Sequence, residues 1–115
     1  MTTADSAYLK RRRHDWADTL LFQLKASKLP LPVREFRFHA VRKFRFDCAW
    51  PERMLATELS GGEWINGMHN RGTGLARDYT KLNLAQLDGW VVLQFTGNQV
   101  KDGSALAQLA KVLNG

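Results

Sequence analysis

The chain is poor in cysteine and proline and has no long hydrophobic run, and each scarcity excludes a class of protein. The single Cys48 cannot form an internal disulfide, and its place in an apolar stretch predicts a small core residue in a reducing compartment. No run approaches the roughly 20 apolar residues of a membrane span. Residues 1–14 contain no apolar segment typical of a signal peptide. We therefore expect a cytoplasmic protein that binds no membrane.

Acidic residues are the minority among the charges. The 17 Lys and Arg outnumber the 11 Asp and Glu, and the formal net charge is +6. This balance favours a polyanionic partner, with nucleic acid as the first candidate and a merely solubilising surface as the alternative. A length of 115 residues predicts one domain, 1–115, of which 1–14 should be a flexible basic tail.

Hydrophobic periodicity predicts alternating helices and strands. Helices are expected at 15–27, 75–89 and 103–114, and strands at 33–39, 42–50, 54–60 and 90–95. The short connection 51–53 predicts an antiparallel pair of strands around it. The continuous apolar character of 90–95 predicts an interior strand, followed by a turn at 96–98. The expected fold class is therefore α/β, with a mixed sheet flanked by helices.

One strand is predicted to have one side in the core, and one helix is predicted to carry a row of side chains along one side. The strand 42–50 alternates, with one face formed by Phe44, Phe46, Cys48 and Trp50. The helix 75–89 places a single row of side chains on one side, formed by Leu75, Tyr79, Leu82 and Gln86, with Leu84 and Leu87 alongside. Gly89 is expected to end this helix.

Asp47 and Glu58 stand inside two strand patterns, where a carboxylate is expensive to bury. If the strands pair around 51–53, the two residues fall within one position of being opposite each other. Side-by-side carboxylates repel, so a positive group should lie between them. Lys43 or Arg45 could form an ordinary ion pair there. The alternative is a divalent cation, since two carboxylates, a backbone carbonyl and waters suit Mg²⁺.

Three stretches resemble a known family: "RFDCAWPERMLATELSGG" at 45–62, "GMHNRG" at 67–72 and "RDYTKLNLAQLDGWVVLQFT" at 77–96. In this order they resemble the PD-(D/E)XK nuclease superfamily, in particular small phage and bacterial endonucleases related to very-short-patch repair endonucleases. The resemblance covers roughly residues 32–100. It implies a restriction-endonuclease-like fold, a mixed four-stranded sheet between helices, and Mg²⁺-dependent endonuclease activity, with Mn²⁺ as a substitute.

Carried over by position, the resemblance implies that Asp47 is the principal metal ligand, Glu58 the second, and the Leu59 carbonyl a further one. The family's lysine should stand two residues after the glutamate, where this chain has Ser60. A serine hydroxyl cannot supply a full positive charge to the attacking water or the developing anion. Lys81 in the following helix is the expected catalytic substitute.

The sequence allows alternative roles for Lys81, a role for His69 and two candidates for a further acidic group. Lys81 could instead form a surface pair with Asp78, three residues earlier on the helix. His69 follows the glycine turn, and the resemblance implies contact with the scissile phosphate or its water network. A further acidic group could come from Asp18 or from Glu35.

Basic residues near these motifs are expected to bind the DNA backbone, and they are Arg42, Lys43, Arg45, Arg71 and Arg77. Between 61 and 74, five glycines would let the chain approach phosphates closely, and Trp64 could stack on an unpaired base or pack the loop.

No base-reading element is recognisable, so we expect structure-selective or weakly sequence-specific cleavage of DNA, branched DNA included, in phage replication, recombination or repair. A homodimer fits such a substrate. The alternatives are a catalytically inactive nucleic-acid-binding module on the same fold, which Ser60 suggests, and a basic protein-interaction factor.

Overall fold

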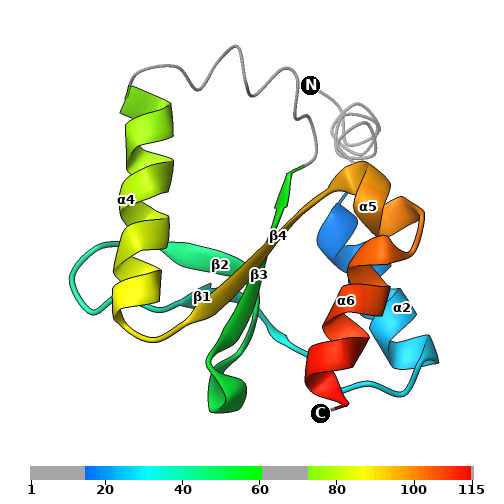
Figure 1. Ribbon diagram of the computed structural model, residues 1–115. Coiled ribbons are helices and arrows are strands. Elements are labelled where there is room, and N and C mark those ends of the chain that lie inside the picture. The colour runs from blue at the N-terminus through cyan, green and yellow to red at the C-terminus, as the bar shows by residue number, and fades with distance from the viewer. Residues whose placement is uncertain (1–14, 61–72, 115) are drawn as a thin grey trace, which may run out of the picture.

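The computed structural model describes residues 15–60 and 73–114. Its elements, in chain order, are α2 (Trp16–Ala26), β1 (Val33–Arg37), β2 (Arg45–Trp50), the 3-10 turn η1 (Pro51–Arg53), β3 (Leu55–Ser60), α4 (Thr73–Leu87), β4 (Val91–Thr96), α5 (Gly97–Lys101) and α6 (Ser104–Leu113). The protein is a small α/β protein, as the sequence predicted (Figure 1).

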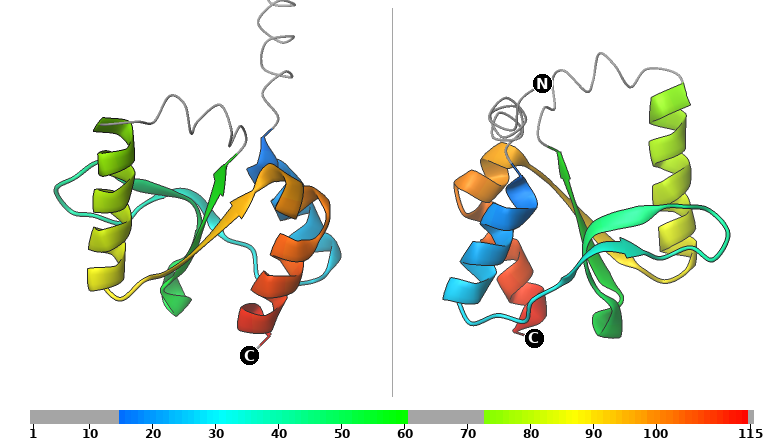
Figure 2. Two further views of the ribbon diagram at one scale, coloured as in Figure 1. Left: turned by 45° about the horizontal axis from the view of Figure 1, so that its top comes forward. Right: turned by 180° about the vertical axis from the view of Figure 1, so that it is seen from behind.

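The four strands form one mixed sheet in the order β1-β2-β3-β4. β1 and β2 are antiparallel, β2 and β3 are antiparallel around η1, and β3 and β4 are parallel. The parallel pair requires a crossover, which α4 provides. α4 covers one face of the sheet and α2, α5 and α6 cover the other (Figures 1 and 2). The predicted sheet flanked by helices is therefore confirmed.

β4 is an edge strand, so the prediction of an interior position was wrong. Its apolar run has a different cause, because helices cover the strand on both faces. Phe95 packs into the core beneath α2, α5 and α6, while Val92 packs against the residues beneath α4. Val91 and Gln94 are exposed.

The larger core lies between the sheet and the helices α2, α5 and α6. Leu20 and Leu24 of α2 and Leu109 of α6 are fully buried there. Trp50, also fully buried, donates its indole N–H to the carbonyl of Pro30 at 2.8 Å, so no polar atom of this ring lacks a partner. This face carries most of the apolar burial that stabilises the fold.

The sequence predicts a turn at 96–98, whereas the structure has the helix α5 there. Thr96 caps this helix: its hydroxyl accepts from the Gln99 N–H, and the Gln99 side chain accepts from the Thr96 N–H. This reciprocal capping box has a visible pattern in the sequence, Thr followed three residues later by Gln. Gly97 lets α5 approach α2, since a Cβ here would lie 2.4 Å from the Trp16 indole nitrogen.

A smaller core lies beneath α4 and consists of Phe46, Ala49, Ala56, Ala85 and Trp90. The Phe38 and Phe46 rings stack with centroids 4.2 Å apart, and Phe46 tilts against Trp90 at 4.9 Å. The row predicted on α4 does not mark its buried face, since Tyr79 in the row is 59% exposed and Leu87 beside it is 83% exposed. α4 meets the sheet over a small aromatic cluster, so Ala85 is its buried contact.

No helix in the described parts of the chain is long and apolar enough to cross a membrane.

Candidate active site

The candidate site lies where β2 and β3 stop pairing regularly. Their pairs Trp50↔Leu55, Ala49↔Ala56 and Cys48↔Thr57 would place Asp47 opposite Glu58 at the next position, as the sequence spacing predicted. At this position backbone N–H groups donate to side-chain carboxylates instead of to backbone carbonyls of the neighbouring strand. The Asp47 N–H donates to Glu58 Oε2 at 3.0 Å, and the Leu59 N–H donates to Asp47 Oδ2 at 2.7 Å. Each carboxylate therefore satisfies a backbone donor of the neighbouring strand.

The strand on the other side of β2 is irregular at the same level. Glu35 stands between the pairs Arg34↔Cys48 and Phe36↔Phe46, and its φ is 53°, in the left-handed region. Such a backbone is uncommon for a residue with a side chain.

The irregularity at Asp47 also changes which face the β2 side chains occupy. Phe46 packs beneath α4, whereas Cys48 and Trp50 pack beneath α2 and α6. The prediction of a single face running from Phe44 to Trp50 was therefore wrong. A period of two holds only while the ladder is regular, and the carboxylate bonds interrupt it.

Lys81 reaches this site from α4. Its ammonium donates to Glu58 Oε1 in an ion pair, with the two side chains only 18% and 20% exposed. Among the described residues, this pairing replaces both alternatives drawn from the sequence, a surface pair with Asp78 and neutralisation by Lys43 or Arg45. The structure thus brings Asp47, Glu58 and Lys81 together.

The environment of Glu58 works against its charge. Burial raises the pKa of this carboxyl above its ordinary value of 4.5, and the nearby Asp47 charge raises it further, against the lowering effect of Lys81 and of the Asp47 N–H. Burial and the same Asp47 charge raise the pKa of the Cys48 thiol to about 12. Cys48 is thus a protonated core residue, as its apolar surroundings predicted.

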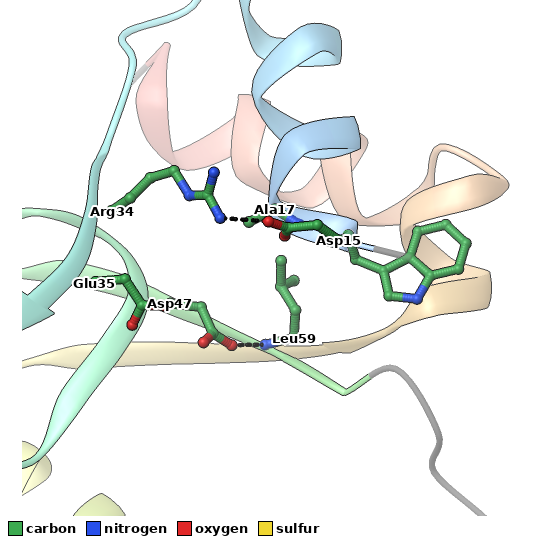
Figure 3. A pocket seen from close by; sticks show the side chains of 7 residues that line it. Asp15, Ala17, Arg34, Glu35, Asp47 and Leu59 are labelled. Carbon is green, nitrogen blue, oxygen red and sulfur yellow. Dashed lines mark hydrogen bonds and ion pairs between the residues drawn. The ribbon is translucent and has the colours of Figure 1, made fainter. Parts of the chain in front are cut away.

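A pocket of about 180 Å³ opens beside Asp47, on the α2 side of the sheet (Figure 3). Its walls come from the start of α2, from β1, and from the ends of β2 and β3, and they are Asp15, Trp16, Ala17, Arg34, Glu35, Asp47 and Leu59. Of the two further acids considered, Glu35 shares this pocket with Asp47 and Asp18 does not line it.

Arg34 ties α2 to β1 at the rim of the pocket. It donates to Asp15 Oδ2 at 2.7 Å and to Asp18 Oδ1 at 2.6 Å. For Asp15, burial raises the pKa, but hydrogen bonds and charge from Arg34, together with the Ala17 N–H, outweigh it and lower the pKa below 3.8. Sequence reasoning missed this role of Arg34; the signal was the spacing of Asp15 and Asp18 at the start of a helix.

The donor set of the site suits a small divalent cation with few protein ligands. Mg²⁺ binds through one or two carboxylates and keeps several waters. Asp47 lines the pocket, and Glu58, which does not line it, offers a second carboxylate that accepts from the Asp47 N–H. A site with more protein ligands is not offered, because no group of three or more His, Cys, Asp or Glu side chains gathers within 15–60 and 73–114. The residues therefore fit a hydrated Mg²⁺ ion.

The basic residues expected to bind DNA lie on the surface. Arg42, Lys43, Arg45 and Arg77 are all exposed. The guanidinium carbons of Arg42 and Arg77 lie 4.8 and 5.4 Å from the centroid of the Phe44 ring, so the structure brings these two together. His69, Arg71 and Trp64 lie outside the described residues.

Comparisons of the chain with protein-family models, with curated proteins and with solved structures found no match.

Proposed function

We propose that the protein is a Mg²⁺-dependent DNA endonuclease that hydrolyses phosphodiester bonds. The observation that carries the proposal is the group of Asp47, Glu58 and Lys81, in which each carboxylate accepts from a backbone N–H of the neighbouring strand and a lysine from the crossover helix binds one of them. The mixed sheet between helices agrees with the fold that the sequence resemblance implies.

The protein's own groups would prepare the site for this reaction. The N–H groups of Asp47 and Leu59 orient the carboxylates of Glu58 and Asp47, respectively, so their positions do not depend on a ligand. A Mg²⁺ ion held by Asp47 and Glu58, with the Leu59 carbonyl as a further ligand, would polarise the scissile phosphodiester and lower the pKa of the attacking water.

Lys81 would take the role of the lysine that Ser60 replaces. Its ammonium already lies at Glu58, and from there it can orient the water and stabilise negative charge that develops on the phosphate. The lysine is supplied from α4 rather than from β3, so the serine at position 60 does not remove the positive charge from the site. Contacts of His69 and Arg71 with the phosphate, and Mn²⁺ as a substitute, remain predictions.

The proposal is tested by cleavage of supercoiled plasmid and of a four-way DNA junction in Mg²⁺ and in EDTA. Asp47→Ala and Glu58→Ala should each lower the rate by about 10³-fold or more, since each removes a ligand of the ion that would polarise the phosphodiester. Glu52→Ala, at an exposed acid of η1, is the matched control and should cleave as the unmodified protein does. Full activity of either site variant would contradict the assigned mechanism.

A second candidate is a nucleic-acid-binding module without catalysis, favoured by Ser60 and by the exposed arginines around Phe44. It predicts salt-sensitive DNA binding with no metal-dependent product. A basic protein-interaction factor is the remaining alternative, and absence of DNA binding at low salt would favour it over both.

A further inference from the structure

The end of the β1–β2 hairpin, residues 36–46, has an unbalanced charge. This stretch contains four Lys and Arg and no Asp or Glu. In Figures 1 and 2 the hairpin end lies beside α4 in every view. We use the name hairpin surface for four arginines in two pairs: Arg42 and, from α4, Arg77 at the Phe44 ring, and Arg37 and Arg45 on the paired strands.

Phe44 holds two of these arginines in place. Its ring is 3% exposed and stacks on Phe38 at a centroid distance of 6.3 Å, while Arg42 and Arg77 both lie over it. Cation–π contact orients a guanidinium without neutralising its charge. Within the described residues neither arginine has an acidic partner, because the ion pairs found there are made by Arg34 and Lys81.

The other two arginines face each other across the hairpin. Arg37 and Arg45 are direct partners in the β1–β2 register, and both are exposed. Like charges at directly opposite positions destabilise a sheet. No carboxylate in the described chain pairs with either side chain. An anion bound from solution would relieve this repulsion.

We propose that the hairpin surface binds the phosphodiester backbone of the nucleic acid, with Phe44 as the platform that positions Arg42 and Arg77. Guanidinium groups match phosphate oxygens in a bidentate geometry. Each DNA strand carries one charge per about 3.4 Å of axis. The guanidinium carbons of Arg42 and Arg77 both lie within 5.4 Å of one ring centroid, so the two side chains can contact one short stretch of a strand. The choice of nucleic acid as the partner rests on the proposed function, but no step of cleavage is involved.

We expect two arginines ordered on the Phe44 ring to bind phosphate more tightly than two unordered cations would. Long side chains lose rotamer freedom when they bind a ligand, and this loss opposes binding. Arg42 and Arg77 have already lost part of that freedom on the ring. Phe44 is thus a positioning residue, which acts on the phosphate through the two arginines.

The test is binding of a fluorescein-labelled duplex of about 20 base pairs, measured by anisotropy in EDTA over a series of salt concentrations. Arg42→Gln/Arg77→Gln should raise Kd and lower the slope of log Kd against log salt by about 2, and Arg37→Gln/Arg45→Gln should do the same. The matched control, Lys101→Gln/Lys111→Gln, removes two exposed cations from α5 and α6 and should leave the slope unchanged.

Phe44→Leu tests the effect of the aromatic ring separately from the effect of the arginine charges. It keeps all four arginines, and Kd should rise about 3- to 10-fold through lost pre-organisation. Phe44→Tyr retains the ring and should bind as the unmodified protein does, which distinguishes loss of the ring from general damage to the hairpin. Thermal unfolding of each variant shows whether it is folded.

The outcomes of the two proposals are distinguishable. Binding that depends on the four arginines in EDTA, without any Mg²⁺-dependent cleavage, would support the hairpin surface and refute the nuclease. Arginine variants that match the lysine control in Kd and slope would overturn the hairpin surface, whatever the cleavage assay shows. Absence of duplex binding at low salt would overturn it as well and would favour an acidic protein partner.

Discussion

Two groups of ion pairs, one at Arg34 and one at Lys81, fasten helices to opposite faces of the sheet, and they differ in the balance between attraction and burial. Arg34 joins β1 to Asp15, the N-cap of α2, and to Asp18 of α2 through exposed side chains, and the pKa of Asp15 is lowered. Lys81 of α4 joins Glu58 of β3 in a half-buried position, and the pKa of Glu58 is raised. At Asp15, hydrogen bonds and the charge of Arg34 together outweigh the effect of burial on the pKa. At Glu58, burial outweighs the lowering effect of Lys81. A carboxylate kept in an environment that opposes its charge marks a functional site more often than a surface tie does.

The largest expected difference between the two faces is in catalysis. Lys81→Met should lower the single-turnover cleavage rate in Mg²⁺ by about 10²- to 10⁴-fold, because the ammonium that would act on the water or the developing anion is lost. Lys25→Met, at an exposed lysine in the last turn of α2, is the control and should change the rate less than about twofold. Equal rates for the two variants would remove Lys81 from the mechanism.

The next difference is in stability. Lys81→Met leaves the half-buried Glu58 carboxylate without its partner, and we expect a loss of about 1–3 kcal/mol in the free energy of unfolding. Arg34→Met should lose at most about 1 kcal/mol, because exposed pairs are screened by water and salt. Urea unfolding in EDTA at low and high salt measures both. A larger loss for Arg34→Met would reverse the contrast between the two pairs.

The smallest expected difference is in how stability depends on pH, which should have opposite signs for Glu58 and Asp15. For Glu58 the folded-state pKa is raised, so the folded protein binds the proton more tightly and its stability falls as pH rises from about 4.5 through the raised pKa. For Asp15 the folded-state pKa is lowered. Its contribution to the free energy of unfolding is therefore present above about pH 3.8 and is lost as pH falls through the lowered pKa.

Unfolding of the metal-free protein across pH measures both effects. Glu58→Gln should remove the fall above pH 4.5, and Asp15→Asn should remove part of the loss below 3.8. A Glu58→Gln variant with the slope of the unmodified protein would show that Glu58 does not carry this dependence.

Local patterns predicted the elements better than their surroundings. The short connection 51–53 was enough to place Asp47 opposite Glu58, because an antiparallel register follows from the turn. The edge position of β4 could not be predicted, since helices on both faces produce the same apolar run as neighbouring strands do. The shift of face at Asp47 depends on bonds to two side chains and has no periodic signal.

The same limit applies to the site. The residue types and their order suggested Asp47 and Glu58, whereas the partner of Glu58 depends on how α4 packs over 20 residues later in the chain. Lys81 was proposed because Ser60 stands where the resembling family has a lysine. In the structure, Lys81 pairs with Glu58 rather than with Asp78. Phe44 was expected only in the core, although its neighbours in "RKFRF" signalled a basic surface.

The most direct test of the central claim is a crystal structure of the protein soaked with Mn²⁺. We predict an anomalous peak between β2 and β3, with oxygens of Asp47 and Glu58 at about 2.0–2.3 Å from the ion and waters completing the shell. Absence of that peak at saturating Mn²⁺, with the Glu58 carboxylate still bound by Lys81 and the Asp47 N–H alone, would contradict it.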